Sequence, residues 1–214
     1  FPYTTLFRSM QPLSSVASWY QLDIMDGTFS PSKTWPYITA EQWPELSGEE
    51  AKKILSSKRF EAHLMVADPL ELGTLLVKAG VERLLVHIEC FKDPAVARAA
   101  VSAWKSAGAK EVGFAILVAT PLSALDPIME IVDSVQVMSI AKVGYQGQPF
   151  DISALTRLHE LRTAHPLLAL EGDGGVSLTN AAQLVSLGAT RLTVGSAFMH
   201  GDPIETFRAF EAAV

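Results

Sequence analysis

The chain has 214 residues, of which 49% are hydrophobic and 19% charged, and its formal net charge is −6 at pH 7. This composition excludes a disordered chain, and the acidic balance argues against a nucleic-acid partner or an anionic membrane surface. A single cysteine, Cys90, excludes an internal disulfide and favours a reducing compartment, so we expect a cytoplasmic protein. No apolar run approaches the ~20 residues of a membrane-spanning helix.

The first residues differ in character from the rest of the chain. Residues 1–9 read Phe-Pro-Tyr-Thr-Thr-Leu-Phe-Arg-Ser and lack the charged and apolar regions of a signal peptide. We interpret residues 1–9 as a non-native segment and expect a single domain over residues 10–214. Residues 10–18 leave no room for both a strand and a full helix.

The first clear strand is predicted over residues 19–25, and Asp26-Gly27 is typical of a tight turn after it. A long loop rich in aromatic residues and prolines follows over 28–44, the kind of segment that covers a site. A helix is predicted over 47–57 because Ser47 and Glu50 have the spacing of a capping box.

Strands and helices then alternate to the end of the chain. Further strands are expected near 60–66, 84–90, 111–117, 133–139, 167–172 and 191–195. Helices are expected near 68–79, 94–107, 121–130, 151–164, 179–187 and 203–213. Several helices have a capping side chain followed by proline as a start signal, at Asp68-Pro69, Asp93-Pro94, Thr120-Pro121 and Asp202-Pro203. Gly80, Gly108 and Gly188 stand where helices should stop.

Seven strands that alternate with helices predict an α/β protein with a parallel sheet, either closed or doubly wound. The strands are apolar almost throughout, as expected when both faces of a sheet are covered. One further strand and helix would complete the count of a TIM (β/α)₈ barrel. We therefore expect a TIM barrel that lacks its first strand and most of its first helix, with the doubly wound sheet as the less favoured alternative.

Three metal-ligating side chains are predicted at the carboxyl ends of different strands: Asp23, His63 and Asp173. In a parallel barrel such strand ends open into one mouth. Two carboxylates and one imidazole suit a divalent ion such as Zn, Mn or Fe(II). Taken alone, His63 is as typical of a packed core residue, and the metal interpretation depends on the convergence.

Glycine-rich segments follow three of the later strands, at 144–148, 173–175 and 195–196. Glycine lets the backbone approach a ligand closely, and successive N–H groups form anion-binding concavities. A phosphate held by the last strands of a barrel is a recurrent arrangement. The sequence therefore predicts a phosphate site beside the metal site.

These motifs together resemble the ribulose-phosphate 3-epimerase family. The matching pieces run in the family's order from about residue 19 to the end: Leu22-Asp23-Ile24-Met25-Asp26-Gly27-Thr28-Phe29-Ser30-Pro31, His63-Leu64-Met65-Val66, Ala119-Thr120-Pro121, Val137-Met138-Ser139, Gly144-Tyr145-Gln146-Gly147-Gln148, Asp173-Gly174-Gly175-Val176 and Gly195-Ser196-Ala197. The resemblance implies a (β/α)₈ fold and the interconversion of D-ribulose 5-phosphate and D-xylulose 5-phosphate, a step of the pentose phosphate pathway. It also implies one divalent metal ion and two aspartates that transfer protons on opposite faces of C3.

By the same resemblance, Asp23 and Asp173 match the two catalytic aspartates and also two metal ligands, while His63 matches a third ligand. Met25 matches a methionine beside the reacting carbons. The phosphate-binding positions correspond to Gly144, Tyr145, Gln146, Gly147, Gly174, Gly175, Gly195 and Ser196. Gln21 stands where the family has a metal-binding histidine, and an amide oxygen is a weaker ligand for Zn or Fe(II).

Other functions stay open at this stage. The chain could be an epimerase of a six-carbon ketose phosphate, a choice that the loop over 28–45 would decide, or a non-catalytic sugar-phosphate-binding barrel. A lyase or decarboxylase is less favoured because no strand-end lysine is paired with aspartates. The expected partner is a small phosphorylated ketose, with a homo-oligomer left open. His87 is interpreted as a core histidine or a neighbour of a metal ligand, and Cys90 as a buried, inert thiol.

Overall fold

The computed structural model describes residues 11–38, 52, 53, 55, 57–145 and 147–214. The predicted segment 1–9, most of the predicted helix over 47–57, the end of the predicted loop over 28–44 and Gln146 lie outside these residues. The domain limits of 10–214 stay a prediction.

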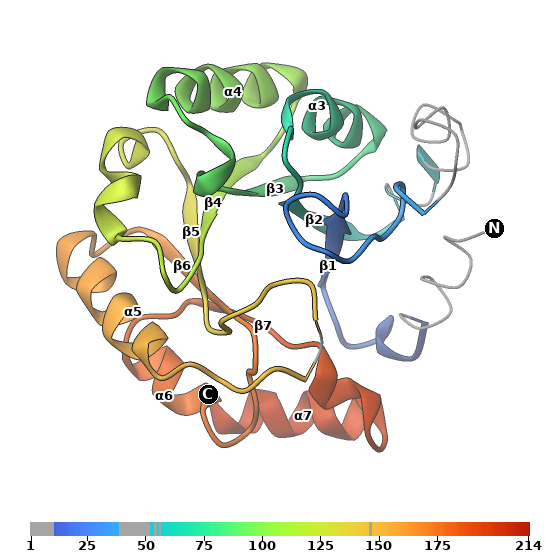
Figure 1. Ribbon diagram of the computed structural model, residues 1–214. Coiled ribbons are helices and arrows are strands. Elements are labelled where there is room, and N and C mark those ends of the chain that lie inside the picture. The colour runs from blue at the N-terminus through green and yellow to red at the C-terminus, as the bar shows by residue number, and fades with distance from the viewer. Residues whose placement is uncertain (1–10, 39–51, 54, 56, 146) are drawn as a thin grey trace.

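Seven parallel strands form one curled sheet in the described part of the chain, in the order in which they occur in the sequence (Figure 1). The strands are β1 (Trp19–Met25), β2 (Arg59–Met65), β3 (Arg83–His87), β4 (Glu111–Ile116), β5 (Ser134–Met138), β6 (Ala169–Asp173) and β7 (Arg191–Thr193). A doubly wound sheet would reverse its strand order at a switch point, so this order excludes that alternative. The predicted barrel of the TIM type is confirmed.

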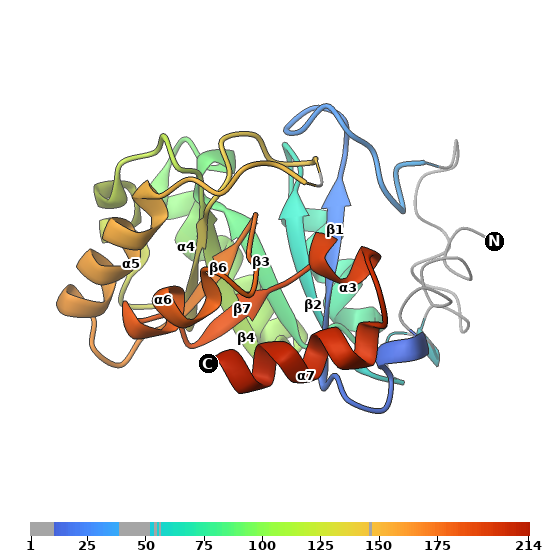
Figure 2. The same cartoon turned by 90° about the horizontal axis from the view of Figure 1, so that it is seen from below.

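Helices surround the ring of strands on its outer side (Figures 1 and 2). They are α3 (Leu70–Ala79), α4 (Pro94–Ala107), α5 (Ser153–Ala164), α6 (Ala181–Ser186) and α7 (Pro203–Ala213), with 3₁₀ turns η1 (Gln11–Leu13), η3 (Ile88–Cys90), η4 (Leu122–Ile128) and η5 (Ser196–Met199). None of the helices that the structure describes is long and apolar enough to cross a membrane.

The predicted helix starts are confirmed at two of four places. Asp93 accepts a hydrogen bond from the first turn of α4, and Asp202 does the same for α7. The Asp68 carboxylate accepts the N–H of Leu70, the first residue of α3, over 3.3 Å, although the helix begins one residue later than predicted, after Pro69. The prediction at Thr120 is wrong as a cap, because η4 begins after Pro121, which has no side chain to accept such a bond. At the other end, α3 and α4 stop at Gly80 and Gly108 as predicted, each with a φ of +114°.

Three predicted elements end or coil differently from expectation. The strand predicted over 84–90 ends at His87, and η3 turns the chain away from the sheet there. The helix predicted over 121–130 is the 3₁₀ turn η4, which contains Pro127. Proline lacks the N–H that a longer α-helix would need at that position. The strand predicted over 191–195 ends at Thr193, and η5 begins shortly after it.

The two faces of the sheet carry different residues. Alternate positions such as Phe60, Ala62 and Leu64 of β2 belong to the large apolar core beneath the helices. The positions between them face the barrel interior, where buried polar residues include Glu61 and His63. This alternation follows from the two-residue period of a strand, and it carries polar side chains to the mouth of the barrel.

Strands β1 and β7 form the two ends of the sheet, and neither pairs with a further strand in the described residues. The sheet is therefore open between β1 and β7, as expected of a barrel that lacks one strand. Across this opening the Thr193 hydroxyl donates to the Gln21 amide oxygen over 2.9 Å. The two edge strands are thus linked through their side chains.

Candidate active site

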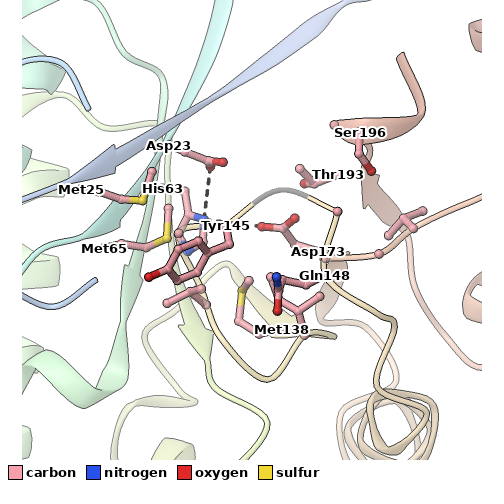
Figure 3. Close-up of a pocket in the computed structure, with 18 residues that line it drawn as sticks. Asp23, Met25, His63, Met65, Met138, Tyr145, Gln148, Asp173, Thr193 and Ser196 are labelled. Carbon is pink, nitrogen blue, oxygen red and sulfur yellow. Dashed lines mark ion pairs between the residues drawn. The ribbon is translucent and has the colours of Figure 1, made fainter. Parts of the chain in front are cut away.

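A pocket opens at the carboxyl ends of the strands (Figure 3). It brings together eleven of the thirteen residues predicted from the sequence: Asp23, Met25, His63, Gly144, Tyr145, Gly147, Asp173, Gly174, Gly175, Gly195 and Ser196. Gln21 lies beside the pocket, and Gln146 lies outside the described residues. Segments from both halves of the chain therefore form one site, as the barrel topology predicts.

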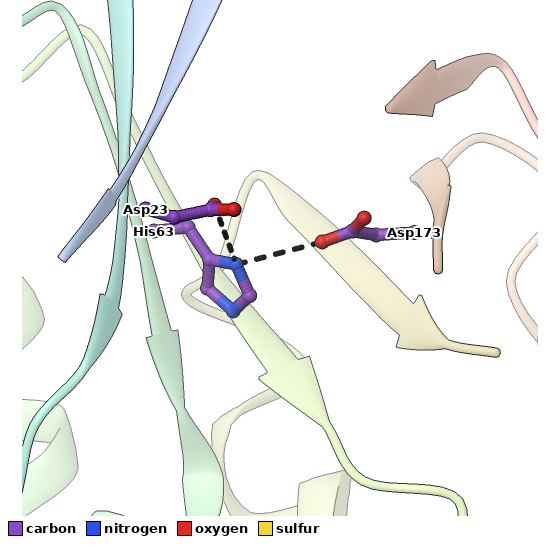
Figure 4. Close-up of side chains that lie close together, drawn as sticks. All are labelled: Asp23, His63 and Asp173. Atoms are coloured by element: carbon purple, nitrogen blue, oxygen red, sulfur yellow. Dashed lines mark ion pairs between the residues drawn. The ribbon is translucent and has the colours of Figure 1, made fainter. Parts of the chain in front are cut away.

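Asp23, His63 and Asp173 form the polar centre of this pocket (Figure 4). The His63 Nδ1 atom lies 3.4 Å from Asp23 Oδ1 and 3.5 Å from Asp173 Oδ2. One ligand atom from each of the three residues lies within 4.8 Å of the other two. This spacing allows a single cation to contact all three.

The strand register explains the convergence. Asp23 of β1 is paired with His63 of β2, so their side chains project from the same face at the same height. Asp173 ends β6 on the other side of the barrel mouth and pairs with Thr193 of β7. The carboxylates thus approach the imidazole from two directions.

The two carboxyl groups differ in acidity. Burial raises the pKa of Asp23, but the hydrogen bond and charge of His63 outweigh it, and the pKa ends below its ordinary value. Burial and the nearby Asp23 charge raise the pKa of Asp173 to about 7. Burial lowers the pKa of His63, but contacts with Asp23 and Asp173 leave it raised. At neutral pH one carboxyl group is therefore ionised while the other is close to half protonated.

Gln21 lies against this cluster. Its amide nitrogen donates to Asp23 Oδ1 over 2.8 Å and to Asp173 Oδ2 over 3.2 Å, while its oxygen accepts from Thr193. The nitrogen, not the oxygen, thus faces the carboxylates. To serve as a metal ligand the amide would have to turn over, in which case the Thr193 hydroxyl could accept from the nitrogen.

Gln136 is a contact that sequence reasoning missed. This fully buried side chain of β5 donates to Asp173 Oδ2 over 3.0 Å and lies 3.4 Å from His63 Nδ1. Its amide oxygen is buried without a hydrogen-bond partner. The available signal was its position two residues before Met138, which places both on the interior face of the strand.

Three methionines, Met25, Met65 and Met138, form part of the apolar lining of the pocket (Figure 3). The sequence predicted the first of them, and the other two follow from strand alternation beyond His63 and Gln136. Thioether side chains adapt their shape to irregular surfaces. They give the polar centre a wall that water cannot hydrogen-bond strongly.

The glycine segments form the rim of the pocket. Gly174 and Gly175 both have positive φ, and an added Cβ would press against Ile140 or Phe150. The Ser139 hydroxyl donates to the carbonyls of Asp173 and Gly174 and so fixes the start of this segment.

The segment after β1 holds the glycine segment after β5. Ser30 donates to the Val143 carbonyl over 3.3 Å, and Ser32 donates to the Gly144 carbonyl over 2.7 Å. Gly144 has a φ of +87° and lies directly against Ser30. These contacts connect two segments that are more than one hundred residues apart.

Asp26, interpreted as a turn residue, caps that turn: it accepts from the N–H groups of Thr28, Phe29 and Ala67. Cys90 is half-buried, which is less than the buried thiol that the sequence predicted. Its thiol donates to the Val66 carbonyl, and burial raises its pKa to about 12. A thiol of this kind is not nucleophilic at neutral pH.

The cluster has the donor set of a divalent-metal site. Two carboxylates and one imidazole suit Zn, Mn or Fe(II), and their spacing lets them share one ion. The carboxyl groups, with different acidities beside an apolar wall, are also suited to giving and taking protons.

Comparisons with known proteins agree with these observations. A family model described as "Ribulose-phosphate 3 epimerase family" matches residues 5–199. The chain is 31% identical to a chloroplastic ribulose-5-phosphate-3-epimerase of Arabidopsis thaliana, with 91% of this chain and 67% of the relative covered. It is also 31% identical to a ribulose-phosphate 3-epimerase of Treponema pallidum, with 86% and 80% covered.

Solved structures resemble the fold at low sequence identity. A 3-hexulose-6-phosphate synthase from Salmonella typhimurium matches with a TM-score of 0.71 at 19% identity, and 97% of this chain and 91% of that chain are covered. A 3-keto-L-gulonate-6-phosphate decarboxylase from Vibrio cholerae matches with a TM-score of 0.72 at 10% identity, with 98% and 91% covered. At these identities the likeness concerns the barrel alone.

Proposed function

Because this chain belongs to the ribulose-phosphate 3-epimerase family, we propose that it interconverts D-ribulose 5-phosphate and D-xylulose 5-phosphate. Family membership makes the chain an isomerase of the epimerase type that acts on a pentose phosphate. The observation that supports inversion at C3 is the pair of carboxyl groups, Asp23 and Asp173, which point toward His63 from two sides (Figure 4).

Inversion at C3 requires a base on one face of the sugar and an acid on the other. The ionised carboxylate removes the C3 proton, and the electron pair of the C–H bond passes into an enediolate over C2 and C3. The protonated carboxyl group then delivers its proton to the opposite face of C3. Asp23 and Asp173 fit these roles because their pKa values are shifted in opposite directions. The two aspartates exchange roles for the reverse reaction.

Asp23, His63 and Asp173 would hold the divalent ion, with Gln21 as a further contact if its amide turns over. When bound, such an ion stabilises negative charge on the sugar oxygens as a Lewis acid. Zn, Fe(II) and Mn all suit this donor set. Other residues act without contacting the ion. Gln136 orients Asp173 by a hydrogen bond, and the methionines keep water away from C3.

The substrate's phosphate group would lie at the glycine rim. Gly144, Tyr145, Gly147, Gly174, Gly175, Gly195 and Ser196 line that side of the pocket, and Gln146 belongs to the same proposal. Backbone N–H groups of such segments bind an anion without a nearby lysine. None of the pocket residues in the described part of the chain is a lysine.

We place this reaction in the cytoplasm because the chain has one cysteine.

The test follows the C3 proton itself. The protein is incubated in D₂O with Zn, Mn or Fe(II) and D-ribulose 5-phosphate, and proton NMR records the second epimer and deuterium at C3. We expect wild type to form D-xylulose 5-phosphate carrying deuterium at C3. In Asp173→Asn one base remains, so we expect deuterium exchange into one epimer while conversion falls by about 10²-fold or more.

The control is Asp93→Asn, because asparagine caps a helix as well as aspartate does and this residue does not line the pocket. Absence of conversion by wild type with every metal would contradict the epimerase assignment. Unchanged conversion by Asp173→Asn would contradict the role of Asp173. Binding of the sugar phosphate with neither conversion nor exchange would favour a non-catalytic binding barrel.

A further inference from the structure

A buried chain of contacts lies behind His63, on the side away from the pocket. The His63 Nε2 atom lies 2.9 Å from His87 Nε2, and both side chains are fully buried. The His87 Nδ1 atom in turn lies 3.1 Å from Glu89 Oε2. The line from Glu89 through His87 thus ends at the residue that faces both catalytic carboxylates.

At Glu89, the far end of this series of contacts, the donor and the acceptor of each hydrogen bond are fixed. Glu89 Oε1 accepts the Leu117 N–H over 2.9 Å, and Thr120 also donates to this carboxylate. A carboxylate that receives hydrogen bonds in this way is an acceptor only. His87 must therefore donate its Nδ1 proton to Glu89, which leaves His87 Nε2 as an acceptor.

The direction of the hydrogen bond between the two histidines follows from this. Since His87 Nε2 accepts, the proton between the two rings belongs to His63 Nε2. The His63 Nδ1 lone pair is then directed toward Asp23 and Asp173, where it can bind a cation. If His63 takes up a second proton, the Nε2 proton stays in place. His63 therefore donates to His87 in both its neutral and its protonated state.

The packing around the two rings holds this arrangement. The His63 and His87 ring centroids are 5.0 Å apart and the rings are inclined by 26°, so the two imidazoles meet edge to edge through their Nε2 atoms, and the Phe29 ring centroid lies 4.7 Å from that of His87. Both histidine side chains are fully buried, so bulk water does not compete directly for their ring nitrogens. If His87 instead carried its proton on Nε2, its Nδ1 lone pair would face a lone pair of the Glu89 carboxylate.

We propose that Glu89 and His87 are positioning residues that keep the proton of His63 on Nε2 and so present the Nδ1 lone pair to a divalent cation at Asp23 and Asp173. The inference rests on the cation of the proposed function, and its proton arrangement can be tested without that cation. Hydrogen bonds behind a metal-binding histidine commonly set its tautomer and are worth 10–100-fold in metal affinity.

The first test uses the wild-type protein, free of metal and labelled with ¹⁵N-histidine. The chain has five histidines, so their ring signals can be assigned by single substitutions. We expect a scalar coupling between the Nε2 atoms of His63 and His87, with the proton attached to His63. A proton attached to His87 Nε2, with none on His63 Nε2, would overturn the proposal.

The second test is Glu89→Gln, which replaces the two carboxylate oxygens that receive the Leu117 N–H and the His87 Nδ1 proton by one amide oxygen and one NH₂ group. If that oxygen still accepts the Leu117 N–H, the amide NH₂ donates to His87 Nδ1. His87 Nε2 then carries the proton and donates to His63 Nε2, so both hydrogen bonds are reversed. We expect the His63 proton to move to Nδ1 and the Zn or Mn dissociation constant to rise 10–100-fold. Isothermal titration at pH 7 measures this constant, independently of turnover.

Trp104→Phe is the matched control. It removes another side-chain hydrogen bond, from the buried indole to the Leu70 carbonyl, and neither residue lines the pocket. A comparable loss of stability with unchanged cation affinity is expected. Wild-type cation affinity in Glu89→Gln would overturn the proposal. If wild type binds no cation at all, the metal of the proposed function fails, and the His63–His87 coupling still decides the position of the proton.

Discussion

At the scale of single residues, Glu61 has an uncommon environment inside the barrel. This buried carboxyl group lies beside Glu171, and its nearest guanidinium, that of Arg83, is 3.9 Å away. Arg191 is already paired with Glu171 over 2.8 Å and with Glu111 over 2.7 Å. Burial, together with the Glu171 charge, raises the pKa of Glu61 to about 8. Glu61 is therefore mostly protonated at neutral pH.

This raised pKa predicts how stability depends on pH. Between the ordinary value of 4.5 and about 8, the folded protein holds a proton that the unfolded chain has released. The free energy of unfolding therefore falls as pH rises, by at most about 1.4 kcal/mol per pH unit from this group. Urea denaturation of Glu61→Gln from pH 5 to 8 should show a flatter dependence than wild type. Glu211→Gln, at an exposed position, should leave the slope of unfolding free energy against pH as in wild type. The same slope in Glu61→Gln would contradict the claim that folded Glu61 holds its proton at neutral pH.

Gly144 and Gly147 offer a matched pair in one glycine segment. Both have positive φ, but a Cβ at Gly144 would strike Ser30 and Met25, whereas one at Gly147 meets nothing within 4 Å. We expect Gly144→Ala to raise the KM for the sugar phosphate about tenfold or more, because strain and displacement together cost ~1–3 kcal/mol. Gly147→Ala bears only the backbone cost, so its KM should change less. Equal effects in steady-state kinetics would show that the contact with Ser30 is unimportant.

At the scale of elements, α3 and α4 pack through a glycine. A Cβ at Gly73 of α3 would lie 2.6 Å from the indole nitrogen of the fully buried Trp104 in α4. Helix propensity alone favours Gly73→Ala by about 1 kcal/mol. Overpacking costs ~1–3 kcal/mol, so we expect a net loss of unfolding free energy in chemical denaturation. In the Trp104→Leu background the same exchange should be neutral or stabilising, and a loss of the same size there would contradict the packing explanation.

The elements also show how far local patterns can predict structure. Helix α4 and its cap at Asp93 follow from the sequence because apolar spacing and the Asp-Pro signal are local. The end of β3 at His87 does not, because Ile88 and Cys90 are as apolar as strand residues. What ends the strand is the turn η3, which carries Glu89 to the Leu117 N–H of a neighbouring segment.

At the scale of the whole molecule, the ring of strands is open between β1 and β7. Strand β4 is paired on both sides and is buried except at its first residue, whereas β7 is half-buried throughout and pairs on one side. Local opening is easiest where few buried contacts hold a segment. Hydrogen exchange should therefore give a lower opening free energy for β7 than for β4. Equal protection of the two strands would show that the opening does not weaken the sheet.

A bound cation would connect strands across the mouth of this open ring. Asp23 lies on β1, His63 on β2 and Asp173 on β6, so one ion would tie both sides of the barrel together. At a concentration of one hundred times its dissociation constant, the ion should add about 2.7 kcal/mol to the free energy of unfolding. Thermal unfolding with Zn or Mn, before and after chelation, measures the gain. Asp173→Asn should lose most of it, and a full gain in that variant would exclude Asp173 as a ligand.

The alternation of strands and helices, the parallel barrel and the strand ends that carry Asp23, His63 and Asp173 can all be predicted from the sequence. These features depend on hydrophobic periodicity and turn residues, which act over a few neighbouring positions. The folded chain was needed to show that Gln136 and Thr193 contact the same cluster, and that Glu89 reaches His63 through His87. Strand alternation could place Gln136 on the interior face, but which side chains it meets there depends on strand register and on the curvature of the sheet, and these depend on the packing of the whole chain.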